Sequence, residues 1–419
     1  MKNYLTAGAA LLLTTTAASA GGIDRTLSNY GTLFEVGNYA ELSFATVKPN
    51  VSGDYSPFFT AAGGGVSSTG DMATDFSTIS GSVKYDLTPR LALGLYANQP
   101  FGADAKYNAG FYQGLAAEWD SKQLAIVLKY KITPNISVYG GARSIESQAN
   151  IAIPDSLVRV QFAGAAQATA AAAAAAQADG DLRTAAALGQ QATALATFAE
   201  TAPAGSLAYT ATTESNRQTS YIAGVAYERP EIALRVALTY ESGYTHDFAT
   251  TESDAGIGLV DYQSTTNITM PDVYTLDFQS GVAKDTLVFG SIRHATWSDW
   301  EVRPEGYATL PGNPRVTGID TDVTTYRIGV GRKINDSFSA FARVTYEAGN
   351  GDELSRLAPT DGSTAFGIGG TYSRDAVKVT AGLEYITFGD GTDNNNPTFG
   401  TVFANNDAVA LGVSVGYRF

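Results

Sequence analysis

The chain of 419 residues has no cysteine, which excludes disulfide bonds and thiolate metal sites. Only 16% of the residues are charged and the formal net charge is -14, so the phosphates of a nucleic acid would be repelled. Beyond residue 20 the sequence also lacks the ~20 consecutive apolar residues that a membrane-spanning helix needs, since the run Ala170–Ala176 is short and weakly hydrophobic. Any residence in a membrane must therefore come from strands.

Histidine is nearly absent, and this limits the catalysis that the chain could perform. His246 begins an expected loop and His294 lies in an expected strand. Thr296 is two residues from His294, which on a strand leaves the two side chains about 7 Å apart, too far for a nucleophile and its base. The polar cluster at 390–396 lacks the ligand spacing of a calcium loop, so a solvated loop is the preferred interpretation. We predict no enzyme, no cofactor and no metal site.

The first twenty residues have the features of a secretory signal peptide. A cation at Lys2 precedes an apolar core at 7–13, and the small residues 18–20 match the pattern that signal peptidase cleaves. The alternative, a membrane anchor, needs a longer apolar run. We therefore expect cleavage after residue 20 and export to the periplasm, with the segment 21–38 leading into the first strand.

Residues 39–419 are dominated by a period-two alternation of apolar and polar side chains. In the last run, Val409–Phe419, every second residue is apolar, and the runs at Ile232–Glu241 and from Val377 repeat the pattern. Short polar turns separate pairs of such runs, at 86–90, 131–135, 228–231, 283–286, 333–337 and 373–376. Longer segments rich in Gly, Asn and Thr separate one pair from the next, at 48–76, 100–115, 151–219, 246–271, 299–324, 349–363 and 389–406.

This order of short and long connections predicts an all-β fold, a 14-stranded antiparallel transmembrane β-barrel over 39–419, in the outer membrane of a Gram-negative bacterium. Short turns would face the periplasm and long loops the outside, with Phe419 at the membrane edge. A water-soluble sandwich is the alternative, but it would not explain the strict alternation of connection lengths.

An alanine-rich segment at 160–200 interrupts the β pattern in the third long loop. Alanine is the strongest helix former, and the sequence Asp179-Gly180-Asp181 divides the segment, so we predict two short helices. A low-complexity insertion without fixed structure is the alternative. Several aromatic residues fall near the expected strand ends and are interpreted as an interfacial girdle: Trp297, Trp300, Tyr307, Tyr372, Tyr385 and Phe388.

Two motifs flank one of the expected hairpins. Met270-Pro271-Asp272-Val273-Tyr274 is followed by a strand, the turn at 284–285, a second strand and then Ala295-Thr296-Trp297-Ser298-Asp299-Trp300. This arrangement resembles the FadL/TodX family of outer-membrane long-chain fatty acid and hydrocarbon transporters, which has a Leu/Met-Pro-Glu/Asp motif and a Thr-Ser/Thr-Trp-Ser-x-aromatic motif at similar spacing. Segments at 84–102, 128–143 and 224–242 also agree with it, so the resemblance spans most of the chain after Tyr39.

The resemblance implies a barrel that accepts a hydrophobic molecule from outside and releases it sideways, through an opening beside a kinked third strand. That kink would fall at Asn98, Pro100, Phe101 and Gly102. The local chemistry agrees, because Pro100 removes a hydrogen-bond donor from the strand ladder and Gly102 tolerates unusual backbone angles. These residues could equally just end a strand and begin a loop.

Two further groups of residues acquire expected roles from the resemblance. Helices in the third loop would cradle the incoming ligand, with an apolar accepting surface made by Phe162, Leu182, Leu188, Leu195 and Phe198. Lumen-facing Arg235, Arg343 and Lys378 could attract a carboxylate, although pairing with Glu241, Glu347 and Glu384 is the preferred interpretation. The family's plug of about forty residues contains an Asn-Pro-Ala motif that is missing here, so 21–38 is expected to form only a short hatch.

The resemblance therefore implies passive, ligand-driven uptake of a hydrophobic small molecule, with long-chain fatty acids as the preferred substrate class. The expected partners are that ligand, outer-membrane lipid, and the barrel-assembly machinery acting through Phe419. We expect a monomer. A general diffusion porin for polar solutes and an adhesin or structural barrel are the alternatives; a porin would line its lumen with opposed charges around water.

Overall fold

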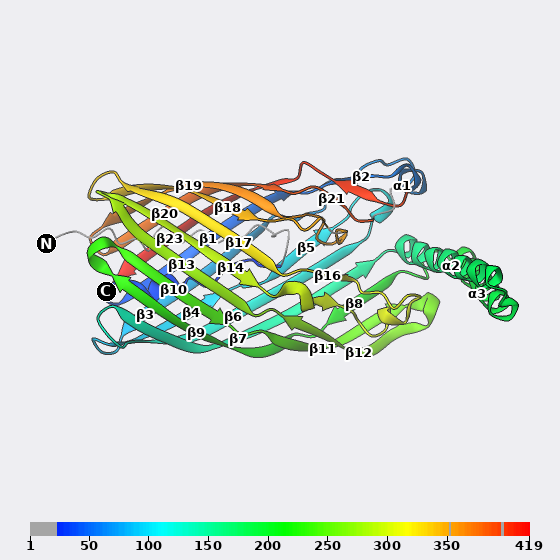
Figure 1. Ribbon diagram of the computed structural model, residues 1–419, viewed down its shortest axis with the longest axis horizontal. Helices are drawn as coiled ribbons and strands as arrows, with labels where there is room; N and C mark the ends of the chain where they lie inside the picture. The colour runs from blue at the N-terminus through cyan, green and yellow to red at the C-terminus, as the bar shows by residue number, and fades with distance from the viewer. Residues whose placement is uncertain (1–22, 352, 395–397) are drawn as a thin grey trace.

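In the computed structural model, which describes residues 23–351, 353–394 and 398–419, fourteen strands form a closed antiparallel barrel, as predicted (Figure 1). The wall strands are β1 (Tyr39–Asn50), β3 (Phe76–Asp86), β4 (Leu91–Asn98), β6 (Ala116–Lys131), β7 (Ile136–Ile153), β9 (Asn216–Arg229), β10 (Leu234–Glu241), β13 (Val273–Ala283), β14 (Thr286–Ala295), β17 (Val323–Lys333), β18 (Phe338–Glu347), β19 (Ser363–Arg374), β20 (Val377–Phe388) and β23 (Asp407–Arg418). The wall closes because β1 pairs with β23 on one side and with β3 on the other.

Side chains alternate between lipid and lumen along these strands. In β23, Leu411 is 48% exposed while Ala410 is 3% exposed, and the same alternation buries Lys378 and Glu384 of β20 inside the barrel. Apolar residues therefore face outward and polar residues inward, which is the reverse of a water-soluble sandwich.

Four further strands extend the wall at the end with the long connections. They are β5 (Gly102–Lys106), β8 (Tyr209–Thr213), β11 (Tyr244–Asp254) and β12 (Leu259–Met270). The loop predicted at 246–271 is wrong, because β11 and β12 pair with each other over most of that range. Threonine-rich strands outside the membrane have polar residues on both faces, so they lack the apolar alternation that marks the wall.

Short elements close the rim of the barrel. Strands β2 (Gly53–Tyr55), β21 (Gly391–Thr392) and β22 (Thr401–Phe403) form a three-stranded sheet, and β15 (Glu301–Val302) pairs with β16 (Thr317–Gly318). A short helix, α1 (Pro57–Ala62), and the 3-10 helices η2 (Tyr30–Phe34), η3 (Gly110–Tyr112), η4 (Pro230–Ile232), η5 (Ala255–Ile257), η6 (Trp297–Asp299) and η7 (Tyr307–Thr309) complete the described elements.

The alanine-rich insertion forms the predicted helical hairpin, α2 (Asp155–Ala178) and α3 (Leu182–Thr201), which projects from the end opposite the C-terminus (Figure 1). Gly180 adopts a positive φ of 82° between the helices, and the Asp181 side chain caps α3 by accepting from Thr184 N–H. Arg159 ties the base of the hairpin together because it binds Asp155 and donates to the Ala199 carbonyl at 2.7 Å.

None of the helices in the described part of the chain is long and apolar enough to cross a membrane.

The predicted aromatic girdle is correct for only part of the set. Tyr372 and Tyr385 are exposed on the outer wall. The other four residues are buried, at 0% to 7% exposure, and belong to the core inside the barrel mouth: Trp297, Trp300, Tyr307 and Phe388. Rim segments fold back into the lumen there, so position near a strand end does not place a ring at the lipid interface.

Candidate ligand passage

The end of the barrel with the long connections is called the upper end below. The lumen at this end holds a cavity of about 110 Å³ with mostly apolar walls. Trp119 of β6 and Trp300 form one side, with ring centroids 6.5 Å apart, and Ile23 lies at the described N-terminal end of the chain. Ala103 of β5 and Ala149 and Ile151 of β7 add to this side, and rim segments that include 316–321 and 353–361 supply the other. The acidic residues of the lining are Asp320, Glu353 and Asp361, together with Glu118, whose side chain faces outward on β6, and no lysine or arginine among the described residues lines this cavity.

Residues 23–26 form a strap that pairs with the predicted kink. The Arg25 N–H donates to the Pro100 carbonyl at 2.8 Å, and the Gly102 N–H donates to the Ile23 carbonyl at 2.8 Å. A Cβ on Gly102 would lie 2.7 Å from Arg25 Nε, so glycine permits this close approach. The strap therefore satisfies backbone groups where the third wall strand is interrupted.

The interruption between β4 and β5 falls at residues 99–101, as the sequence predicted. Asn98 is buried and donates to the Thr26 carbonyl at 2.6 Å, while the Phe101 N–H donates to Ser121 Oγ at 2.8 Å. The Phe101 ring packs edge-on against Trp297. All four predicted kink residues thus hold the strap or the wall around the break.

A gap in the wall accompanies this break. Strand β3 pairs with β4 only from Gly81 to Asp86, and among the described residues an isolated bridge between Ala73 and Ala105 is the next contact beyond it. Above the break, β5 pairs with β6 and leaves β3. One pocket inside the barrel and one outside it share the same four lining residues, Ser80, Gly81, Ala97 and Asn98.

Arg25 spans this gap from the inside. Its guanidinium lies 3.6 Å from the centre of the Phe76 ring on β3 and 2.6 Å from Asp104 Oδ2 on β5. The neighbouring Asp24 forms a buried ion pair with Arg293 of β14, at 2.7 Å. The strap is therefore anchored to three separate parts of the wall, on both sides of the gap and across the lumen.

Below the strap, residues 29–38 occupy the lumen as a short hatch. The Phe34 ring lies between two wall cations, with Lys129 Nζ 4.1 Å and Arg235 Cζ 4.8 Å from its centre. Glu35 binds Lys378 at 2.7 Å, and Lys84 donates to the carbonyl oxygens of Glu35 and Gly37. A cavity of about 70 Å³ remains beside the hatch and is lined by Arg235, Asp277, Arg293 and Arg327, among others.

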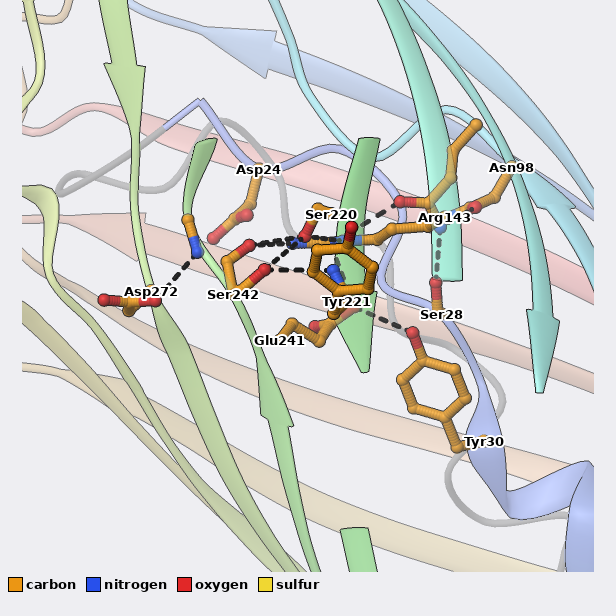
Figure 2. Close-up of polar contacts among 12 residues, drawn as sticks. Asp24, Ser28, Tyr30, Asn98, Arg143, Ser220, Tyr221, Glu241, Ser242 and Asp272 are labelled. Carbon is orange, nitrogen blue, oxygen red and sulfur yellow. Dashed lines mark hydrogen bonds and ion pairs between the residues drawn. The ribbon is translucent and has the colours of Figure 1, made fainter. Parts of the chain in front are cut away.

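The ion pair between Arg143 and Glu241, two residues of the wall, holds this hatch in place (Figure 2). The Arg143 guanidinium binds Glu241 Oε1 at 2.9 Å and donates to Ser220 Oγ at 3.0 Å and to the Ser242 carbonyl at 3.2 Å. The Tyr30 hydroxyl of the hatch donates to the same Glu241 oxygen at 2.8 Å. One buried ion pair therefore carries both a wall contact and a hatch contact.

The predicted pairing of the lumenal cations is correct in one case. Arg343 binds Glu384 at 2.7 Å, whereas Lys378 binds Glu35 and Arg235 stacks on Phe34. Glu241 binds Arg143 instead of Arg235. The sequence alternation identified these side chains as lumenal but could not identify their neighbours across the barrel.

Three of the five predicted ligand-accepting residues of the hairpin, Phe162, Leu195 and Phe198, pack inward in this structure. Phe162 is 7% exposed and its ring centre lies 4.7 Å from that of Phe198, so these two residues join the helices to each other. Leu195 packs against the core of the barrel mouth. Leu182 alone of the five is strongly exposed, at 68%, so these side chains form no continuous apolar surface.

The polar cluster in the last loop holds the rim together. Asp393 is buried and accepts from Thr401 N–H at 2.6 Å and from Arg356 Nε at 2.8 Å. Tyr112 donates to it, and burial raises the pKa of the Tyr112 hydroxyl above its ordinary value. Within the described ranges no group of acidic or histidine side chains is arranged to hold a metal ion; residues 395–396 of the cluster lie outside the described chain.

Asp24 and Arg25 of the strap are functional candidates that were not predicted from the sequence. Their partners, Arg293 and Asp104, lie 269 and 79 residues away, so no local pattern links them. Two adjacent charges in an otherwise weakly charged N-terminal segment were the only available indication.

Comparison with known proteins agrees with this fold. A crystal structure of a Pseudomonas aeruginosa FadL homologue superposes with a TM-score of 0.69 at 12% identity, covering 97% of each chain. The Pseudomonas putida toluene transporter TodX gives a TM-score of 0.61 at 14% identity, covering 97% of this chain and 99% of that one. The Ralstonia pickettii toluene transporter TbuX gives 0.55 at 13% identity, covering 92% and 90%. No curated protein matches the sequence.

The fold and its internal hatch define an outer-membrane transport barrel for hydrophobic compounds. A family model described as outer membrane protein transport protein (OMPP1/FadL/TodX) matches residues 2–419, and the chain belongs to that family.

Proposed function

We propose that hydrophobic small molecules enter the upper cavity, move by passive, ligand-driven diffusion, and leave sideways through the gap between β3 and β5. The observation that carries this proposal is the wall gap, because Ser80, Gly81, Ala97 and Asn98 line pockets on both of its sides. Continued movement down the barrel axis is unfavourable, since the lower lumen contains the hatch and buried charges such as Arg143 and Arg327.

The upper cavity favours a neutral ligand of the size of a single aromatic ring. Its volume of about 110 Å³ is of the same order as the ~150 Å³ apolar cavity that holds benzene in an engineered protein. Its acidic lining would repel a carboxylate, although Arg315 neutralises Asp320 in an ion pair. The toluene transporters among the structural relatives are consistent with this substrate class.

Long-chain fatty acids, the class preferred from sequence, are the second candidate. The cavity beside the hatch favours them, because Arg235 and Arg327 line it and could bind a carboxylate there. A fatty acid would then have its head group below the gap and its chain in the upper lumen.

Adding a cation to the upper cavity should change its ligand preference. We expect Leu357→Lys to bind benzoate at least tenfold more tightly than the native chain does, since a charge-assisted hydrogen bond contributes about 1.5–3 kcal/mol. Toluene binding should fall in the same variant. Leu357→Met, which conserves volume, is the control, and both ligands can be measured by calorimetry on the purified barrel. Unchanged benzoate affinity in Leu357→Lys would argue against this cavity as the binding site.

Filling the wall gap should block uptake. Ser80→Trp places an indole in the inner pocket at the gap, and we expect at least a tenfold loss of labelled toluene or oleate uptake by cells that express the variant. Ser77→Trp puts the same side chain on the exposed face of β3 and should leave uptake intact. Equal uptake by both variants would refute the lateral route. Whichever ligand depends on Ser80 identifies the substrate class.

We propose that residues 1–20 are a cleaved signal peptide, a segment outside the described residues, and that the protein acts as a monomer. Phe419 stacks on Tyr417 at the exposed end of β23, where the barrel-assembly machinery could bind it.

A further inference from the structure

The outer, lipid-facing wall has a trough beside the gap. Leu42, Gly81, Ala97 and Leu124 are cross-strand neighbours on β1, β3, β4 and β6. Two small residues between two leucines leave a furrow in the wall. Outer pockets of about 450 Å³ and 520 Å³ both include these four residues, so they form one continuous trough.

The lower part of the trough is apolar. Its outward-facing side chains are exposed hydrophobic residues, Val83, Leu95, Val415 and Tyr417. An acyl chain would meet almost only carbon there, but this alone gives no selectivity, because surrounding lipid tails are equally apolar. Any preference among lipids must therefore come from the upper end of the trough.

The upper end carries a row of charges. Three charged residues, Lys122, Glu146 and Arg217, are cross-strand neighbours on β6, β7 and β9. All three line the outer pocket of about 520 Å³. Arg217 forms an ion pair with Glu146, whereas no ion pair of Lys122 is found in the described part of the chain. The row therefore has a net charge of +1.

The height of this row matches the head-group region of the membrane. Below Lys122 the outward-facing residues of β6 are Leu124, Ile126 and Leu128, and above it they are Asp120 and Glu118. The outer face of β6 thus changes from apolar to charged at Lys122. Charged side chains at this boundary reach phosphate groups, while the trough below reaches the acyl chains.

We propose that this trough binds an anionic membrane lipid, with its phosphate on Lys122 and Arg217 and one acyl chain along Gly81 and Ala97. The bound lipid covers the outer face of the wall gap, so a molecule leaving the barrel must displace it. A neutral ligand in transit would make no use of the two cations, which is why a resident phospholipid fits the site better. The binding of lipid can be measured without any transport, so it is tested separately from the proposed function.

The test uses the full chain in nanodiscs of phosphatidylcholine with a minor fraction of phosphatidylglycerol, followed by native mass spectrometry of the retained lipids. The native barrel should retain phosphatidylglycerol in preference to phosphatidylcholine. Lys122→Gln/Arg217→Gln should lose about twenty-fivefold of this preference, given roughly fivefold for each of the two cations near the surface. Lys48→Gln removes another exposed outward cation, on β1 outside the trough, and should retain the preference.

Ala97→Leu provides the second arm, because it fills the trough and leaves the charges in place. We expect it to lose both lipids while retaining the heat-modifiable gel migration of a folded barrel. Glycerol phosphate alone should not displace the lipid from the native chain. The proposal is overturned if the native barrel does not discriminate, if Lys48→Gln is as damaging as the double variant, or if glycerol phosphate competes fully while Ala97→Leu has no effect.

Discussion

Replacing Arg143 with methionine should destabilise the barrel by about 3–5 kcal/mol, because it leaves the Glu241 carboxylate as an uncompensated buried charge. The side chain of Arg143 is only 3% exposed, and its guanidinium also holds Ser220 and the backbone of Ser242, so no single solvent molecule replaces it (Figure 2). Unfolding in urea, followed by tryptophan fluorescence in lipid vesicles, measures this loss.

The matched control is Arg229→Met. Arg229 also forms an ion pair, with Glu231 at 2.8 Å, but both side chains are about half exposed in a turn, so the expected loss is at most ~1 kcal/mol. Adding Glu241→Gln to Arg143→Met should recover part of the stability, since the orphaned charge is removed. A loss below ~1 kcal/mol in Arg143→Met would show that Glu241 is solvated and that the lower lumen is open to water.

The number of wall strands, and which end of the barrel carries the short turns, could be predicted from the sequence for a simple physical reason. A strand between lipid and lumen must alternate apolar and polar residues, and the short turns at one end contain few residues to confuse the pattern. Pro100 likewise marked the strand break correctly, because its missing N–H removes a hydrogen bond from the strand ladder. These are local properties, and local sequence is sufficient to reveal them.

The contents of the lumen could not be predicted in the same way. The Arg343–Glu384 ion pair depends on register, because Gly367 lies between them on β19 and leaves space for the two side chains to meet. A Cβ on Gly367 would lie 3.0 Å from Arg343 Cγ. Glu35 reaches Lys378 across 343 positions of sequence. Alternation tells which side chains point inward, but only register and the path of the hatch decide which ones touch.

Releasing the N-terminal strap should convert the closed barrel into a conducting one. Asp24→Asn/Arg25→Gln removes the ion pairs to Arg293 and Asp104, and loss of about 3 kcal/mol from buried pairing shifts a two-state equilibrium by roughly a hundredfold. In planar bilayers we therefore expect rare, brief openings of the native barrel and a channel-open fraction about a hundredfold higher in the variant.

Lys333→Gln/Asp336→Asn is the control for this experiment, because it removes an ion pair in an exposed turn and should leave the currents unchanged. The native recording is informative by itself. If the strap, through Asp24 and Arg25, and the hatch, through Glu35, block the lumen, the native barrel should pass little steady current. A general porin would instead pass large and constant currents with the strap intact. Large native currents that the double variant does not change would therefore mean that the strap does not obstruct the lumen, and the argument against movement down the barrel axis would fail.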